Sequence, residues 1–245
     1  MFVINIYNKS SVVTNDEVKI MISGCELLIP ILCEKWSILL PSIQFIEGNP
    51  LNSSRNDILF VMLDNSDQVG ALGYHTEENN RVNGFIFCKT ILDNGGVKFY
   101  KDNNTPTIAS ALFHELAETI IDPTCNIWWD DFKGTLYSAE ICDPVQNGIV
   151  LVNIDNLQIG LSDFIYPSWK DSQALSNSNI QFNYLNTLKS PFTLDNGGYY
   201  VIRNKYGKQS QIIKYNTQSW ILQYKKFYSR ISLRLKYPTS KCLIL

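Results

Sequence analysis

The chain has 245 residues, of which 45% are hydrophobic and 12% are aromatic, so it can bury a sizeable core and does not have the composition of a disordered protein. The formal net charge of −2 excludes a chain that is strongly basic or acidic throughout. No window approaches 18 uninterrupted apolar residues, and the start lacks the features of a signal peptide. We therefore expect no membrane span, an intracellular location and six reduced cysteines.

Charge is unevenly divided along the chain. Residues 196–245 contain ten Lys or Arg and no Asp or Glu, so residues 1–195 hold the remaining 11 basic and all 23 acidic residues, a balance of −12. This split predicts a main domain over residues 1–172 and a basic extension over residues 173–245. The extension is suited to an acidic partner or nucleic acid. Alternatively, it packs against the acidic part of the same fold or of a neighbouring subunit.

The first half of the chain alternates short apolar runs with helical patterns. Residues 2–7 predict a strand, and residues 14–32 predict a helix capped by Thr14, Asn15 or Asp16. Short runs rich in Ile, Val and Phe predict buried strands at residues 43–46 and 58–63. Residues 70–90 predict extended chain with a turn, and the Gly-rich segment 92–96 predicts a tight turn.

A second helix follows, with Thr105 as its cap and Pro106 in its first turn. Pro123 cannot continue it, so it should end at Ile121 or Asp122. The element order predicts an α+β domain with a helix under a mixed sheet. Beyond it we expect loops to about residue 170, a linker near residues 170–179 and a hairpin over residues 199–215; the last 25 residues fit helix or strand equally.

The second helix contains the segment FHELAETIIDP, residues 113–123. His114 and Glu118 are four residues apart, so they lie on one helical face and can reach one metal ion. Glu115 is placed to hold a metal-bound water and act as its general base, as in zinc proteases that carry H-E-x-x-H. Glu118 replaces the second histidine, which still permits Zn²⁺ and makes Mn²⁺ or Fe²⁺ alternatives.

A third ligand should be a carboxylate, because the chain has only two histidines, His75 and His114. Glu140 is the first candidate, followed by Asp143 and then Asp122. Glu140 lies 22 residues after Glu118. In one large class of zinc proteases a glutamate at about this sequence distance is the third ligand, and a nearby aspartate supports a histidine ligand. Glu140 and Asp143 suit those two roles. The competing interpretation is that H-E-x-x-E arose by chance on a solvated helical face.

The extended segment before this helix suggests a further role for Tyr74 or His75. Edge strands in this position line the cleft of zinc proteases and pair with the substrate backbone, so either side chain could stabilise an oxyanion. A surface histidine in a loop is the alternative. A nucleophilic pair of His114 with Cys125 or Cys142 is conceivable but has no local support, and no G-x-S-x-G motif or P-loop is present.

Five ordered blocks, GALGYH, HELAETIIDP, AEICDPV, LSDFIYPSWK and PFTLDNGGYY, span about residues 70–200. Together they resemble a zincin-like family of uncharacterised metallopeptidases from bacteria, phages and large DNA viruses. The resemblance implies a zincin-like metalloprotease fold with a mixed sheet over an active-site helix, His114 and Glu118 as metal ligands, Glu115 as base and Glu140 with Asp143 as the acidic pair. Phe113, Gln146 and Lys170 depart from the family pattern without removing a ligand.

These observations predict a zinc-dependent peptidase or amide hydrolase that acts on a peptide or protein substrate. The alternative is a non-catalytic structural or binding protein on a metal-stabilised scaffold, as in a component of a virus or phage particle. A third hypothesis is nucleic-acid binding by the tail, where aromatic residues alternate with Lys and Arg.

Overall fold

A five-stranded mixed sheet forms one side of the molecule in the computed structural model, which describes residues 2–48, 54, 57–174 and 179–214. The strands lie in the order β2-β1-β3-β5-β4. All neighbouring pairs are parallel except β4 and β5, so β4 is an antiparallel edge strand. The strands are β1 (Val3–Asn8), β2 (Ser42–Phe45), β3 (Ile58–Leu63), β4 (Gly73–Glu78) and β5 (Arg81–Phe87).

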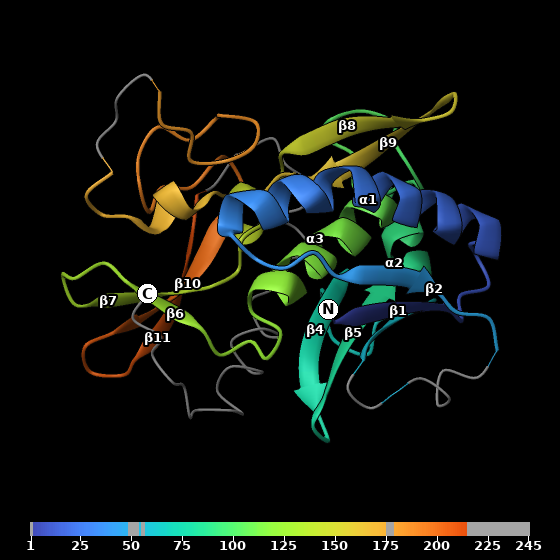
Figure 1. The fold of residues 1–245 in the computed structure, drawn as a ribbon, viewed down its shortest axis with the longest axis horizontal. Helices are drawn as coiled ribbons and strands as arrows, with labels where there is room; N and C mark the ends of the chain where they lie inside the picture. The colour runs from blue at the N-terminus through green and yellow to red at the C-terminus, as the bar shows by residue number, and fades with distance from the viewer. Residues whose placement is uncertain (1, 49–53, 55–56, 175–178, 215–245) are drawn as a thin grey trace.

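Two long helices pack on one face of this sheet (Figure 1). α1 (Asn15–Trp36) starts with a capping box between Thr14 and Glu17, which satisfies two backbone N–H groups at its N-terminus. It ends at Ser37, a residue in the left-handed conformation. The apolar stripe of α1 faces the sheet, and Pro30 lies on its exposed side without ending the helix.

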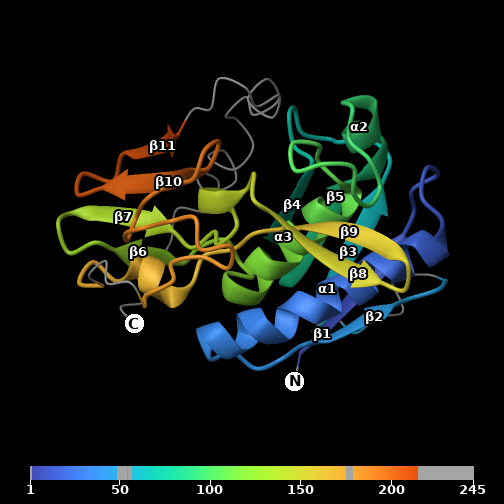
Figure 2. The ribbon, with the colours of Figure 1, turned by 90° about the horizontal axis from the view of Figure 1, so that it is seen from above.

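The second helix, α3 (Ile108–Ile121), is the more enclosed of the two long helices. It packs against α1, β5, β4 and β9, so it lies between the sheet and a hairpin made of β8 (Ile149–Ile154) and β9 (Leu157–Ser162). Figure 2 shows the hairpin lying across the helices from the other side. Eleven of the 14 residues of α3 are buried. A helix enclosed in this way should be apolar all round, so its buried polar side chains need partners within the fold.

A four-stranded sheet occupies the other end of the molecule (Figures 1 and 2), in the order β11-β10-β7-β6. Its strands are β6 (Trp128–Asp130), β7 (Thr135–Ser138), β10 (Tyr199–Asn204) and β11 (Gln209–Ile213). β10 pairs with β7, so this sheet continues across the boundary predicted between residues 172 and 173. Aromatic rings join the sheet to the main core, with Tyr137, Trp169, Phe192 and Tyr200 in mutual contact.

Short helices complete the structure: α2 (Cys88–Asp93) and the 3-10 helices η2 (Asp143–Val145) and η3 (Pro167–Lys170). The α+β class, the first five strands, the first long helix and the C-terminal hairpin agree with the sequence predictions. Three local predictions were wrong. Thr107 caps α3 instead of Thr105, residues 88–90 begin the helix α2 instead of being extended, and the region expected to be loops contains β8 and β9.

The described cysteines are free thiols, namely Cys25, Cys33, Cys88, Cys125 and Cys142. Within the described part of the chain, no helix has the length and apolar character needed to cross a membrane. The nucleic-acid hypothesis depends mainly on residues 215–245, which lie outside the described residues.

Candidate metal centre

α3 carries the site because its helical spacing directs three polar side chains toward two different neighbours. His114 and Glu118 lie one turn apart and face the segment that leads into η2. Glu115 faces β4, where Gly73 allows a close approach: a Cβ at Gly73 would lie 3.0 Å from the Cγ atom of Glu115. Glu115 and Glu118 are 3% and 0% exposed, so both carboxyl groups are almost completely removed from water.

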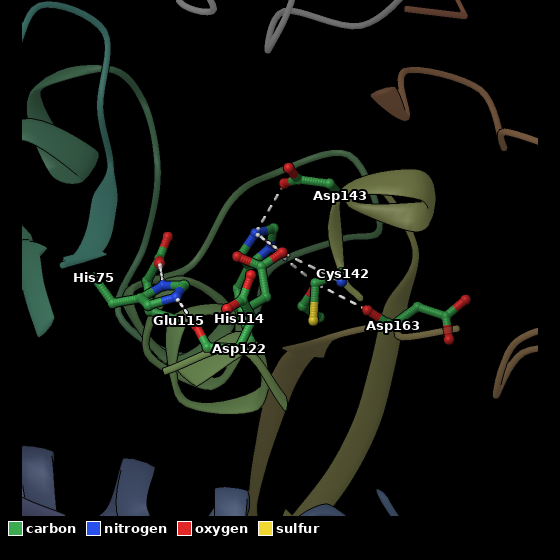
Figure 3. A network of polar contacts seen from close by, with 9 residues as sticks. His75, His114, Glu115, Asp122, Cys142, Asp143 and Asp163 are labelled. Atoms are coloured by element: carbon green, nitrogen blue, oxygen red, sulfur yellow. Dashed lines mark hydrogen bonds and ion pairs between the residues drawn. The ribbon is translucent and has the colours of Figure 1, made fainter. Parts of the chain in front are cut away.

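The imidazole of His114 lies between two carboxylates. Its Nε2 atom is 3.1 Å from Oε1 of Glu118 and 3.2 Å from Oδ1 of Asp143, which is the first residue of η2. Figure 3 shows Asp143 approaching from the side opposite to His75. The Nδ1 atom of His114 lies 3.5 Å from the hydroxyl of Ser162 at the end of β9. Three separate elements therefore fix this ring.

The imidazole of His75 is buried on the β4 side of α3 (Figure 3). Its Nδ1 atom is 3.1 Å from Oε2 of Glu115, and its Nε2 atom is 3.0 Å from the backbone carbonyl oxygen of Asp122. The thiol of Cys125 contacts the backbone carbonyl of His75 at 3.4 Å. Helix α3 and the loop after it therefore hold the ring that β4 carries.

Two groups of side chains bring ligand atoms close enough to share a metal ion. One contains His114, Glu118 and Cys142, and the other contains His75, Glu118 and Glu140; within each group the ligand atoms lie within 4.8 Å of one another. Ligands on one tetrahedral zinc ion, with bonds of about 2.0–2.3 Å, are separated by roughly 3.5 Å. Small side-chain movements would therefore close either group around an ion, and the donors fit a divalent metal.

The electrostatic environment favours positive charge at both histidines. Burial opposes the imidazolium of His114, but Glu118, Asp143 and Glu115 outweigh it and raise the pKa of His114 to about 9. Burial likewise opposes the charged form of His75, and Cys125, Glu115 and Glu140 outweigh it, so the pKa of His75 lies well above its ordinary value. A metal ion would take the place of these protons and be stabilised by the same carboxylates.

Two candidates from the sequence are placed away from the ligand groups. Tyr74 points to the opposite face of β4, where it packs against Phe85 and Phe87 and donates its hydroxyl to Oδ2 of Asp67 at 3.0 Å. Side chains alternate along a strand, so His75 and Tyr74 cannot both face α3. The carboxylate of Asp122 accepts the backbone N–H groups of Asn126 and Ile127, and it shapes the loop after α3.

The contacts of Asp143 suit one of its two predicted roles better than the other. As the support of a histidine ligand it would contact the nitrogen that faces away from the metal. It instead contacts Nε2 of His114, the same atom that faces Glu118. The supporting position at Nδ1 belongs to Ser162. Asp143 is thus placed as a ligand candidate, whereas Glu140 is grouped with His75 and Glu118.

Sequence reasoning missed three contributors. Cys142 was considered only as a nucleophile, but its thiol is buried and its backbone N–H donates to Oε1 of Glu118 at 3.3 Å. Burial and the charges of Glu118, Asp143 and Asp163 raise the pKa of Cys142 well above its ordinary value, which disfavours a reactive thiolate without a metal. The position of Cys142 between Glu140 and Asp143 was its only signal. Gly73 and Ser162 had no sequence signal beyond their positions in the GALGYH and LSDFIYPSWK blocks.

Comparison of the chain with family models, curated proteins and solved structures finds no match.

Proposed function

We propose that the protein is a metal-dependent hydrolase of peptide or amide bonds, with its metal held by His114 and Glu118. The observation that carries this proposal is the contact of the His114 Nε2 atom with two carboxylates at 3.1 and 3.2 Å, inside a cluster whose ligand atoms have metal-binding spacing. Asp143 or Cys142 supplies the third donor. The mixed sheet with an antiparallel edge strand beside the helix, together with the five sequence blocks, supports a zincin-like scaffold.

The residues around His114 suit hydrolysis. A divalent metal bound there supplies a Lewis acid and lowers the pKa of a bound water to about 7. Glu115 follows His114 directly in the sequence, and as the general base it would accept the proton of that water and pass it to the leaving amine. The His114 side chain remains 13% exposed, whereas those of Glu118 and Asp143 are fully buried, so substrate would approach from the His114 side.

The test combines elemental analysis with a screen of peptide substrates, using protein purified without chelator. We expect at least one equivalent of zinc, manganese or iron per chain, and cleavage that is lost on chelation. Glu115→Gln should retain the metal at His114 and lower turnover by about 10²–10⁴-fold, which is the usual contribution of a general base. Glu26→Gln changes an exposed glutamate on α1 and should leave both properties unchanged.

Two results would count against this function or its assignments, and a third measurement identifies the third donor. Protein without metal would overturn the proposal. Unchanged turnover in Glu115→Gln would remove this residue from the mechanism. For the third donor, a sulfur-to-cobalt charge-transfer band in cobalt-loaded protein would identify Cys142, and its absence would favour Asp143.

A second candidate function follows from the burial of the ligands. Glu118 and Asp143 belong to α3 and η2, so a metal bound by both would connect the helix to the start of the segment that leads to β8. This arrangement suits a non-catalytic protein that a metal stabilises. A melting temperature that depends strongly on metal, with no cleavage of any peptide tested, would favour this candidate.

A further inference from the structure

The two histidines of the cluster share an arrangement that a single metal does not explain. In each ring, one nitrogen contacts a backbone carbonyl or hydroxyl oxygen and the other contacts at least one carboxylate oxygen. Histidines that bind metals commonly have this arrangement, because a hydrogen bond from one ring N–H fixes the tautomer and directs the other nitrogen at the metal. The same reasoning therefore applies to both rings.

His75 shows the arrangement most clearly. Its Nε2 atom lies 3.0 Å from the carbonyl oxygen of Asp122, and a carbonyl oxygen can only accept a hydrogen bond. Nε2 must therefore carry the proton in this contact. The Nδ1 atom is directed at Oε2 of Glu115 and belongs to a side chain that is 2% exposed. In the neutral ring that binds a metal, Nδ1 is therefore the nitrogen left as the ligand atom.

His114 is held in the opposite sense. The Ser162 hydroxyl lies 3.1 Å from the carbonyl oxygen of Asp163, to which it donates its one proton, so it can only accept from His114. In the neutral ring that binds a metal, the proton of His114 is then on Nδ1, and Nε2 faces Glu118 and Asp143. The chain thus presents Nδ1 of one histidine and Nε2 of the other, from opposite sides of α3.

Glu118 belongs to both ligand groups, and it is the only residue common to them. Its two carboxylate oxygens allow it to contact two ions at once. We propose that the protein holds a second divalent metal ion through His75, Glu118 and Glu140, with Glu118 bridging it to the ion at His114. Two-metal hydrolases place their ions about 3.5–4 Å apart. This inference rests on the proposed function, because it extends the same cluster.

Occupation of the second position would change the surroundings of Glu115. In the present structure Oε2 of Glu115 contacts the Nδ1 atom of His75. With Nδ1 engaged as a ligand, the Glu115 carboxylate would be released from this contact and would be available to water. The second metal would then raise the hydrolytic activity of the site at His114 in two ways, by freeing the Glu115 carboxylate and by adding positive charge beside the first metal.

The test is the number of metal ions that the wild-type chain binds. Chelator-treated, dialysed protein is titrated with Zn²⁺ by calorimetry, and the loaded protein is analysed for zinc. We expect two ions per chain and a melting temperature that rises in two steps. Glu140→Gln should retain one tight site and weaken the other by about 100-fold or more, because the loss of even an outer-shell partner costs 10–100-fold. Glu78→Gln, an exposed change on the same strand as His75, should bind two ions.

The outcomes separate this inference from the proposed function. One ion per wild-type chain, with cleavage that depends on Glu115, would overturn the second position and leave the hydrolase intact. No bound ion would overturn both. Because the wild-type stoichiometry decides the question, a Glu140→Gln variant that fails to fold does not affect the test. If that variant folds and still binds two ions with unchanged affinity, Glu140 is not a ligand and the inference fails.

Discussion

The two sides of α3 hold similar chemistry in different enclosures. On the β4 side, the side chain of His75 is 2% exposed, and its ring contacts the backbone carbonyl of Asp122 at 3.0 Å. On the η2 side, the ring of His114 is 13% exposed and contacts a serine hydroxyl at the longer distance of 3.5 Å. The difference indicates that the His75 side is the more enclosed half of the cluster and that the His114 side is the half more open to solvent.

The largest effect should come from Glu118, which both sides share. Glu118→Gln keeps the size of the side chain but removes the charge that both histidines face. We expect zinc affinity to fall by about 100-fold or more at every position of the cluster. The measurement is zinc titration of the folded variant, with Glu26→Gln as the exposed control. Loss of affinity at one position alone would show that the two halves do not share a ligand.

Ser162 should affect the His114 side alone. Ser162→Ala removes the only contact described at the Nδ1 atom of His114, so the ring is less well oriented. Removal of such a supporting partner typically weakens metal binding by 10–100-fold. We expect this loss at the position of His114 and no change at the position of His75. Equal weakening at both positions would mean that Ser162 acts on the fold as a whole. Unchanged affinity would show that the long contact does not orient the ring.

The sequence predicted one side of this comparison much better than the other. Helical spacing was sufficient to place His114 and Glu118 together, since residues four apart on a helix always share a face. The five-stranded sheet was also predictable, because its strands are short apolar runs. The approach of β4 to α3, which brings His75 to Glu115, followed only from the resemblance to zinc proteases.

Partners that come from distant segments were not predictable. Ser162 reaches His114 because β9 packs against α3, a contact between residues 48 apart in the chain. The β8–β9 hairpin was itself missed, so its contacts could not be foreseen. The pairing of β10 with β7 likewise joins segments more than 60 residues apart. Local patterns contain no information about such long-range packing, whereas the pleat of β4 could have excluded Tyr74 once His75 was chosen.

The smallest effect should be on the pH dependence of stability and concerns Asp163. This residue follows Ser162, whose hydroxyl contacts His114. Its Oδ1 atom accepts the backbone N–H groups of Phe164 and Leu185, and its Oδ2 atom accepts the amide of Asn183 at 2.5 Å. Burial favours the uncharged carboxyl group more strongly than these donors favour the carboxylate, and it raises the pKa of Asp163 to about 7.

The direction of the pH dependence follows from this shift. An aspartate in the unfolded chain has a pKa near 3.8, so between about pH 4 and pH 7 the folded protein binds the proton that the unfolded chain has released. The contribution of Asp163 to stability is therefore full at low pH and is lost as the pH rises toward 7, by up to about 1.4 kcal/mol per pH unit.

Asp163→Asn cannot titrate, and its amide would conflict with that of Asn183, so it should be less stable at every pH. The free energy of unfolding, measured by urea denaturation in excess chelator at pH 5, 6 and 7, should fall more steeply in the wild type than in the variant. Parallel curves would show that Asp163 is already ionised at pH 5, and the buried support of the His114 side would then be a hydrogen-bonded carboxylate.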